Sequence, residues 1–189
     1  MKTSETSIIR GSLGALAAQS GKSLAETFLS ADVVILVDTS GSMGMRDSRG
    51  GRTRYDVACE ELATLQSSMP GKIALINFSS FPQFEPSGKP QFLCGGTDLA
   101  SALRFARVAD VPGMRFILIS DGQPDEPDEA LHEARQYTNR IDVIYVGPEN
   151  LPSGRDFLAQ LARASGGQAI TADRARELGS GIRALLAAG

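Results

Sequence analysis

Oxygen-bearing side chains follow an apolar run in the first third of the chain. Residues 33–37 are continuously apolar, and Asp38, Ser40 and Ser42 come directly after them in a turn that contains glycine. Carboxylates and hydroxyls suit hard cations, and Mg²⁺ in particular takes six oxygens in near-octahedral order at about 2.0–2.1 Å. Because three side chains cannot complete such a shell, we expect other segments to supply further oxygen ligands.

Two later segments supply them, each at a point where a strand or loop leads into a helix. Thr97 follows a pair of glycines and precedes the helical pattern of Leu99, Ala102, Leu103 and Ala106. Asp121 follows the apolar run 116–119. One Asp-x-Ser-x-Ser pattern is common in turns, but three separated segments of this kind favour a metal site. We expect Asp98, next to Thr97, to start a helix rather than to bind metal.

The elements that must position these residues alternate along the chain. The runs 33–37, 73–78, 116–119 and 143–146 are unbroken and apolar, as is typical of parallel strands covered on both faces. Helical patterns separate them, one of which includes Leu131, Ala134 and Tyr137, and residues 168–171 indicate a short last strand. This alternation predicts a doubly wound α/β sheet.

One connection does not fit the alternation. The segment between Phe78 and Thr97 is too short for a helical crossover, and it contains Pro82, Pro86 and Pro90. Proline is confined to the edges of sheets, and antiparallel neighbours need only a short connection. We therefore expect an antiparallel edge strand in this segment.

The three oxygen-bearing segments, taken in order, resemble a known site. Asp38-x-Ser40-x-Ser42, then Thr97, then Asp121 is similar to the metal-ion-dependent adhesion site of a von Willebrand factor type A (VWA) domain of the stand-alone bacterial type. The resemblance runs from about Asp32 to the C-terminus. It implies a Rossmann-like, mostly parallel six-stranded sheet in the order 3-2-1-4-5-6, with one antiparallel edge strand and helices on both faces.

The resemblance also implies a function. The five residues would hold Mg²⁺, with Mn²⁺ or Ca²⁺ as alternatives, and one coordination position would be left to water or to an acidic side chain of a protein partner. Ser40 and Ser42 would ligate directly, and the other three directly or through water. Stand-alone bacterial domains of this type resemble subunits that work beside ATPases, kinases or chelatases. We therefore expect a metal-dependent protein–protein interaction module and not an enzyme.

Two alternatives use the same site. The first is a Mg²⁺-dependent hydrolase or phosphoryl-transfer enzyme, but the only histidine, His132, stands between acidic residues on a polar stretch where we expect an exposed helix, and a general base is lacking. The second is a secreted adhesin. The stretch 12–18 is a poor signal-peptide core, because Glu5 precedes it and its apolar residues are mostly small. We favour a cytoplasmic protein.

Composition limits the partners. The chain has 189 residues, of which 42% are hydrophobic, and a net charge of −3. The length and the apolar content predict one domain. Because the strand and helix pattern begins near Asp32, we place this domain at residues 31–189, after a helical N-terminal extension, residues 1–30. The charge balance does not favour nucleic acid or an anionic membrane, and no apolar run is long enough to span a bilayer.

Four arginines follow the metal loop on a glycine-rich segment: Arg46, Arg49, Arg52 and Arg54, offset only by Asp47. Our hypothesis is a mobile basic rim that steers an acidic partner toward the ion, and the alternative is an ordinary solvated loop. RNA is disfavoured, because no aromatic residue lies within the cluster to stack on a base.

Two further expectations concern the cysteines and the C-terminus. Two cysteines are too few for a disulfide framework, and Cys59 and Cys94 are not clustered as a thiolate metal site requires, so we expect buried free thiols. Residues 174–186 have a helical pattern that would close the chain. Family members often switch state by moving their last helix, and the resemblance implies that such coupling is available here.

Overall fold

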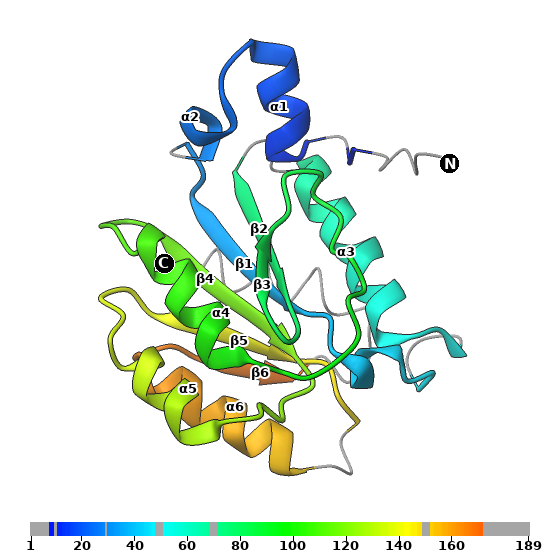
Figure 1. Ribbon diagram of the computed structural model, residues 1–189, viewed down its shortest axis with the longest axis vertical. Helices are drawn as coiled ribbons and strands as arrows, with labels where there is room; N and C mark the ends of the chain where they lie inside the picture. Colours follow the sequence, from blue (N-terminus) through cyan, green and yellow to red (C-terminus); the bar gives the residue numbers. More distant parts are fainter. Residues whose placement is uncertain are drawn as a thin grey trace.

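A six-stranded sheet forms the centre of the molecule. The computed structural model describes residues 8–9, 11–28, 30–47, 51–68, 72–148 and 152–171 (Figure 1). The sheet has the order β3-β2-β1-β4-β5-β6, and β2 and β3 pair antiparallel whereas the other neighbours are parallel. This confirms the predicted fold class, strand order and edge strand. The strands are β1 Val33–Asp38, β2 Ile73–Phe78, β3 Pro82–Phe84, β4 Arg115–Ser120, β5 Ile141–Tyr145 and β6 Ala169–Thr171.

Helices cover both faces of the sheet. Helices α4, α5 and α6 lie on one face and α3 on the other (Figure 1). Because strand residues alternate between faces, Val34 and Leu36 of β1 join the core under α4 to α6, whereas Val33 and Ile35 join the core under α3. The helices are α1 Leu13–Ser20, α2 Leu24–Phe28, α3 Arg54–Ser68, α4 Leu99–Ala106, α5 Pro127–Ala134 and α6 Pro152–Ala164, with short 3₁₀ segments at η1 Gly41–Gly44 and η3 Arg107–Ala109.

The N-terminal segment forms two short helices where we expected one. Helix α1 is capped by the Ser12 hydroxyl, which accepts a hydrogen bond from the Ala15 N–H. It ends at Gly21, whose φ of 67° is the left-handed conformation that glycine adopts at helix ends. The Gly14 N–H donates to the Pro86 carbonyl at 2.8 Å, so α1 is docked beside the edge strand. The division at residue 30 into an extension and a domain stays a prediction.

Two other helical expectations have different outcomes. Helix α5 ends at Ala134, so Tyr137 lies beyond it. The buried ring of Tyr137 packs edge-to-face on Phe116, with 4.9 Å between the ring centroids. The Tyr137 hydroxyl donates to the Leu103 carbonyl at 2.6 Å. The periodicity that included Tyr137 therefore reflects core packing and not helix. The predicted closing helix, residues 174–186, lies outside the described residues.

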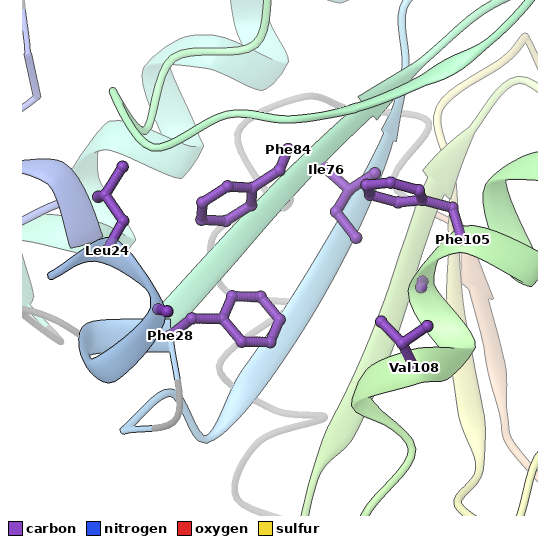
Figure 2. A pocket seen from close by; sticks show the side chains of 8 residues that line it. Leu24, Phe28, Ile76, Phe84, Phe105 and Val108 are labelled. Carbon is purple, nitrogen blue, oxygen red and sulfur yellow. The ribbon is translucent and has the colours of Figure 1, made fainter.

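An apolar pocket of about 450 Å³ opens toward the amino ends of the strands, away from the end where β1 reaches Asp38. Figure 2 shows α2, β2, β3 and the end of α4 meeting around it. Its lining carries no oxygen ligands for a cation. It is formed by Leu24, Ala25, Phe28, Ile76, Phe84, Phe105, Ala106 and Val108. Among the described helices, none is both long and apolar enough to cross a membrane.

Candidate metal centre

The candidate site lies at the carboxyl ends of two neighbouring strands. β1 ends at Asp38, and its parallel neighbour β4 ends at Ser120, directly before Asp121. β1 and β4 are adjacent at the middle of the sheet, where the winding direction reverses. Open α/β sheets bind ligands in the crevice at this point. The fold therefore brings together two carboxylates that are 83 positions apart in sequence.

The Asp38 carboxylate is held in one orientation. It is completely buried, its Oδ1 accepts a hydrogen bond from the Ser40 N–H at 2.8 Å, and its Oδ2 accepts one from the Ser120 hydroxyl at 2.7 Å. The Ser120 hydroxyl also accepts from the Gly122 N–H at 3.0 Å. Sequence analysis missed Ser120, although its position as the last strand residue before Asp121 was a usable signal.

Asp38 is poorly compensated in charge. Burial, and after it the nearby Asp121 charge, raise the pKa of Asp38 to about 6, although the hydrogen bonds from Ser40 and Ser120 oppose the rise. A buried anion near a second anion is unfavourable without a counter-charge. Asp38 is therefore suited to receive a cation.

Two hydroxyls extend the oxygen cluster. The Ser40 and Ser42 Oγ atoms are 3.2 Å apart, and the Ser42 hydroxyl donates to Asp121 Oδ1 at 3.0 Å. In an octahedral shell with bonds of 2.0–2.1 Å, adjacent ligands are about 2.9 Å apart. The observed separations therefore match the spacing of ligands around an ion such as Mg²⁺.

Thr97 lies in a loop that contacts both of the other segments. The Gly95 carbonyl accepts from the Gly41 N–H at 3.2 Å, which joins this loop to the one after β1. The Thr97 N–H donates to Asp125 Oδ2 at 2.9 Å, and the Asp125 N–H donates back to the Thr97 carbonyl at 3.1 Å. Asp125 therefore holds the backbone of Thr97 in place, a role that sequence analysis did not assign to it. Asp98 is the N-cap of α4, as predicted, and accepts from the Ser101 N–H.

Arg54 corrects the hypothesis of a four-arginine rim. It is buried, with 6% of its side chain exposed, at the first position of α3. Its Nη1 donates to Asp121 Oδ2 at 2.7 Å, its Nε donates to Asp47 Oδ1 at 2.7 Å, and its Nη2 donates to Asp47 Oδ2. The two carboxylates draw this arginine into the site. Arg46 and Arg52 are exposed, Arg49 lies outside the described residues, and a partner-binding role for these three stays a prediction.

The prediction of two buried thiols is wrong for Cys94. Cys59 is partly buried on α3, whereas Cys94 is exposed, with a φ of 58°, in a segment without regular structure. The Cys94 N–H donates to the Thr39 carbonyl at 3.0 Å. This segment crosses the surface beside the loop that follows β1 instead of continuing a buried strand, so Cys94 faces solvent. His132 is exposed on α5, as predicted.

The donor set fits a hard divalent cation. The described residues contain no group of three or more His, Cys, Asp or Glu side chains that could hold a metal, so soft or nitrogen-rich coordination is not offered there. Two carboxylates and neighbouring hydroxyls instead offer oxygen and balance two positive charges. Beside them lies a pocket of about 90 Å³, whose lining includes Ser42, Arg54, Asp121, Gln123, Tyr145 and Ser153.

Solved structures with a similar fold exist, although no family model and no curated protein sequence matches the chain. An aerotolerance-related membrane protein from Bacteroides fragilis, bearing multiple mutations to serine, has 17% identity over 83% of this chain and 98% of that chain, with a TM-score of 0.65. BatB from Bacteroides thetaiotaomicron, described as a conserved hypothetical protein, has 17% identity over 82% and 97%, with a TM-score of 0.63.

A third similar structure is that of a metal-loaded protein. The manganese-loaded TRAP protein from Plasmodium vivax has 16% identity over 84% of this chain and 74% of that chain, with a TM-score of 0.57. At sequence identities of 16–17%, the likeness to these structures shows a shared fold and nothing further. Together with the strand order and the single antiparallel edge strand, these likenesses show that the chain has the von Willebrand factor type A fold.

Proposed function

We propose that this chain binds one divalent cation, Mg²⁺ or Mn²⁺, through Asp38, Ser40, Ser42, Thr97 and Asp121, and that the bound cation holds an acidic side chain of a protein partner. The protein is then an interaction module and not an enzyme. The main support is the chain of oxygen atoms from Ser40 through Ser42 to Asp121, with separations of 3.2 and 3.0 Å, beside the buried Asp38.

The two carboxylates and the two serines have distinct tasks in this proposal. Asp38 supplies a buried charge in a fixed orientation, because the Ser40 N–H and the Ser120 hydroxyl hold both of its oxygens. Ser40 and Ser42 supply neutral oxygens, and Asp121 supplies the second charge. When bound, the cation supplies a Lewis-acidic position for a carboxylate. Because only two of the five ligands are anionic, little negative charge remains to repel an acidic partner.

Removing the two serine hydroxyls tests the proposal. We expect the Ser40→Ala/Ser42→Ala protein to bind Mn²⁺ at least about 100-fold more weakly than the wild type in calorimetry, because two ligands are lost. The matched control, Ser20→Ala/Ser101→Ala, removes two hydroxyls from α1 and α4 and should bind normally. Equal Mn²⁺ affinity in all three proteins would contradict the proposed ligand set.

The same variants identify the partner. Affinity purification with the wild-type chain in Mg²⁺, in EDTA and with the double variant should give proteins that are captured only in the first sample. The exposed acidic residues of a captured protein can then be replaced one at a time and the capture repeated in Mg²⁺. The replacement that abolishes capture identifies the carboxylate that contacts the cation. If capture is the same in EDTA, the metal does not mediate the interaction.

Two further measurements separate the alternatives. The enzyme alternative requires turnover of generic phosphatase or esterase substrates in Mg²⁺ that an Asp38→Ala change abolishes. Against it, the Ser40 and Ser42 hydroxyls pair with each other and with Asp121, not with a histidine. Cell fractionation decides between a cytoplasmic subunit beside an ATPase, kinase or chelatase, which we propose, and a secreted adhesin.

A further inference from the structure

Arg54 connects the candidate site to a second acidic residue. Its guanidinium lies between Asp121, which it contacts through Nη1 at 2.7 Å, and Asp47, which it contacts through both Nε and Nη2. Arg54 and the Asp121 side chain are 6% and 7% exposed. This is a buried arrangement, because only Asp47, at 37%, reaches solvent appreciably.

The two candidate carboxylates are therefore compensated differently. The Asp121 Oδ2 is ion-paired with the Arg54 guanidinium, and the Asp121 Oδ1 accepts a hydrogen bond from the Ser42 hydroxyl. Asp38 is held by neutral donors, the Ser40 N–H and the Ser120 hydroxyl. One of the two charges that a divalent ion needs is thus already paired with a residue of the chain.

We propose that Arg54 competes with the divalent ion for the Asp121 carboxylate and thereby sets the ion affinity of the site. This inference rests on the proposed function. A guanidinium in contact with a metal ligand repels an incoming cation at short range, in a region with little water to screen it. The ion must either displace the Arg54 Nη1 from Asp121 or bind beside it, and both lower its affinity.

Asp47 limits this competition. Its carboxylate accepts two hydrogen bonds from Arg54, which lower the pKa of Asp47, so it is an anion at neutral pH and offsets part of the guanidinium charge. Removing Arg54 and removing Asp47 should therefore change the ion affinity in opposite directions. A purely structural role for the pair predicts the same direction, because either change breaks the same contact.

Mn²⁺ titrations of four proteins test the inference, with free Mn²⁺ followed by electron paramagnetic resonance and heat by calorimetry. We expect Arg54→Met to bind Mn²⁺ about tenfold more tightly than the wild type, and Asp47→Asn about threefold more weakly. The control Arg46→Met removes the same charge from an exposed position on the same segment, and its affinity should stay within about twofold because solvent screens it.

Thermal unfolding gives a second readout. Without metal, Arg54→Met removes the ion-pair partner of Asp121, so this variant should melt below the wild type. Saturating Mn²⁺ should raise its melting temperature by more than that of the wild type. If Arg54→Met does not fold, Asp47→Asn carries the test alone, and normal or tighter Mn²⁺ binding by that variant overturns the inference.

The outcomes separate this inference from the proposed function. If the wild type binds Mn²⁺ and Arg54→Met binds it equally or more weakly, the competition is refuted and the metal site stands. If none of the four proteins takes up Mn²⁺, the proposed function fails, and the inference fails with it.

Discussion

Replacing Asp38 by asparagine is expected to abolish divalent-ion binding and, without metal, to make the protein more stable than the wild type at pH 8. Loss of an anionic ligand should weaken Mn²⁺ binding at least about 100-fold. The gain in stability follows from the burial of Asp38 beside Asp121, which raises its pKa from 3.8 to about 6. If Asp38 destabilises the metal-free chain in this way, its role is to bind a ligand and not to stabilise the fold.

The size of the stability gain follows from the pKa. A rise from 3.8 to about 6 means that ionising Asp38 costs about 3 kcal/mol more in the folded chain than in the unfolded one, at 1.36 kcal/mol per pH unit. Asparagine avoids this cost. It can still accept from the Ser40 N–H, and the Ser120 hydroxyl can rotate to accept from the new amide.

The sign of the pH dependence is determined by the raised pKa. The folded state binds the Asp38 proton more tightly than the unfolded state, so this contribution to stability is fully present below about pH 4 and is lost as the pH rises through 6. Metal-free wild type should therefore lose stability over this interval relative to Asp38→Asn. Added Mn²⁺ should raise the wild-type melting temperature more at pH 8 than at pH 5.

Denaturant unfolding of both proteins in EDTA at pH 4, 6 and 8 measures this effect. Asp142→Asn is the matched control: Asp142 is also buried, but it is ion-paired with Arg140 at 3.3 Å and accepts from the Gln168 N–H, so neutralising it should destabilise the protein. A wild type that is as stable as Asp38→Asn at pH 8 without metal would show that Asp38 is compensated by groups other than a cation.

Gly122→Ala is expected to destabilise the protein by about 2–5 kcal/mol and to weaken Mn²⁺ binding at least tenfold. Gly122 has a φ of 95°, and a Cβ there would lie 2.5 Å from the Gly154 carbonyl oxygen at the start of α6. An alanine at this position would therefore destabilise the protein through both conformational strain and a backbone clash. Since Gly122 directly follows Asp121, relief of the clash must displace the carboxylate from Ser42.

Gly113→Ala separates the two causes. Gly113 has a φ of 87°, but a Cβ there meets nothing within 4 Å, so only conformational strain of about 1–2 kcal/mol remains. It lies before β4, away from the site, and Mn²⁺ binding should be unchanged. Chemical denaturation and calorimetry of both variants give the comparison, and normal Mn²⁺ affinity in Gly122→Ala would mean that the Gly122–Gly154 contact does not position Asp121.

The extent to which the sequence predicts this protein differs between fold and site. The strands were predictable, because residues 33–37 and 116–119 are apolar on both faces and only a doubly covered parallel sheet buries such runs. The edge strand was predictable from Pro82, which cannot donate to a sheet. The break at Gly21 was not anticipated, since helical spacing continues across α1 and α2 while the left-handed turn depends on one residue.

For the site, the sequence determined the chemistry: carboxylates and hydroxyls placed at strand ends specify a hard-cation centre, because ligand preference is a property of the side chains themselves. Tertiary structure alone decided the charge balance. Asp38 and Asp121 face each other only because β1 and β4 are neighbours, and Arg54 leaves the surface only because Asp47 and Asp121 converge on it. Electrostatic interactions depend on distance in space and on burial. Both are properties of the folded structure, and the order of residues along the chain does not specify them directly.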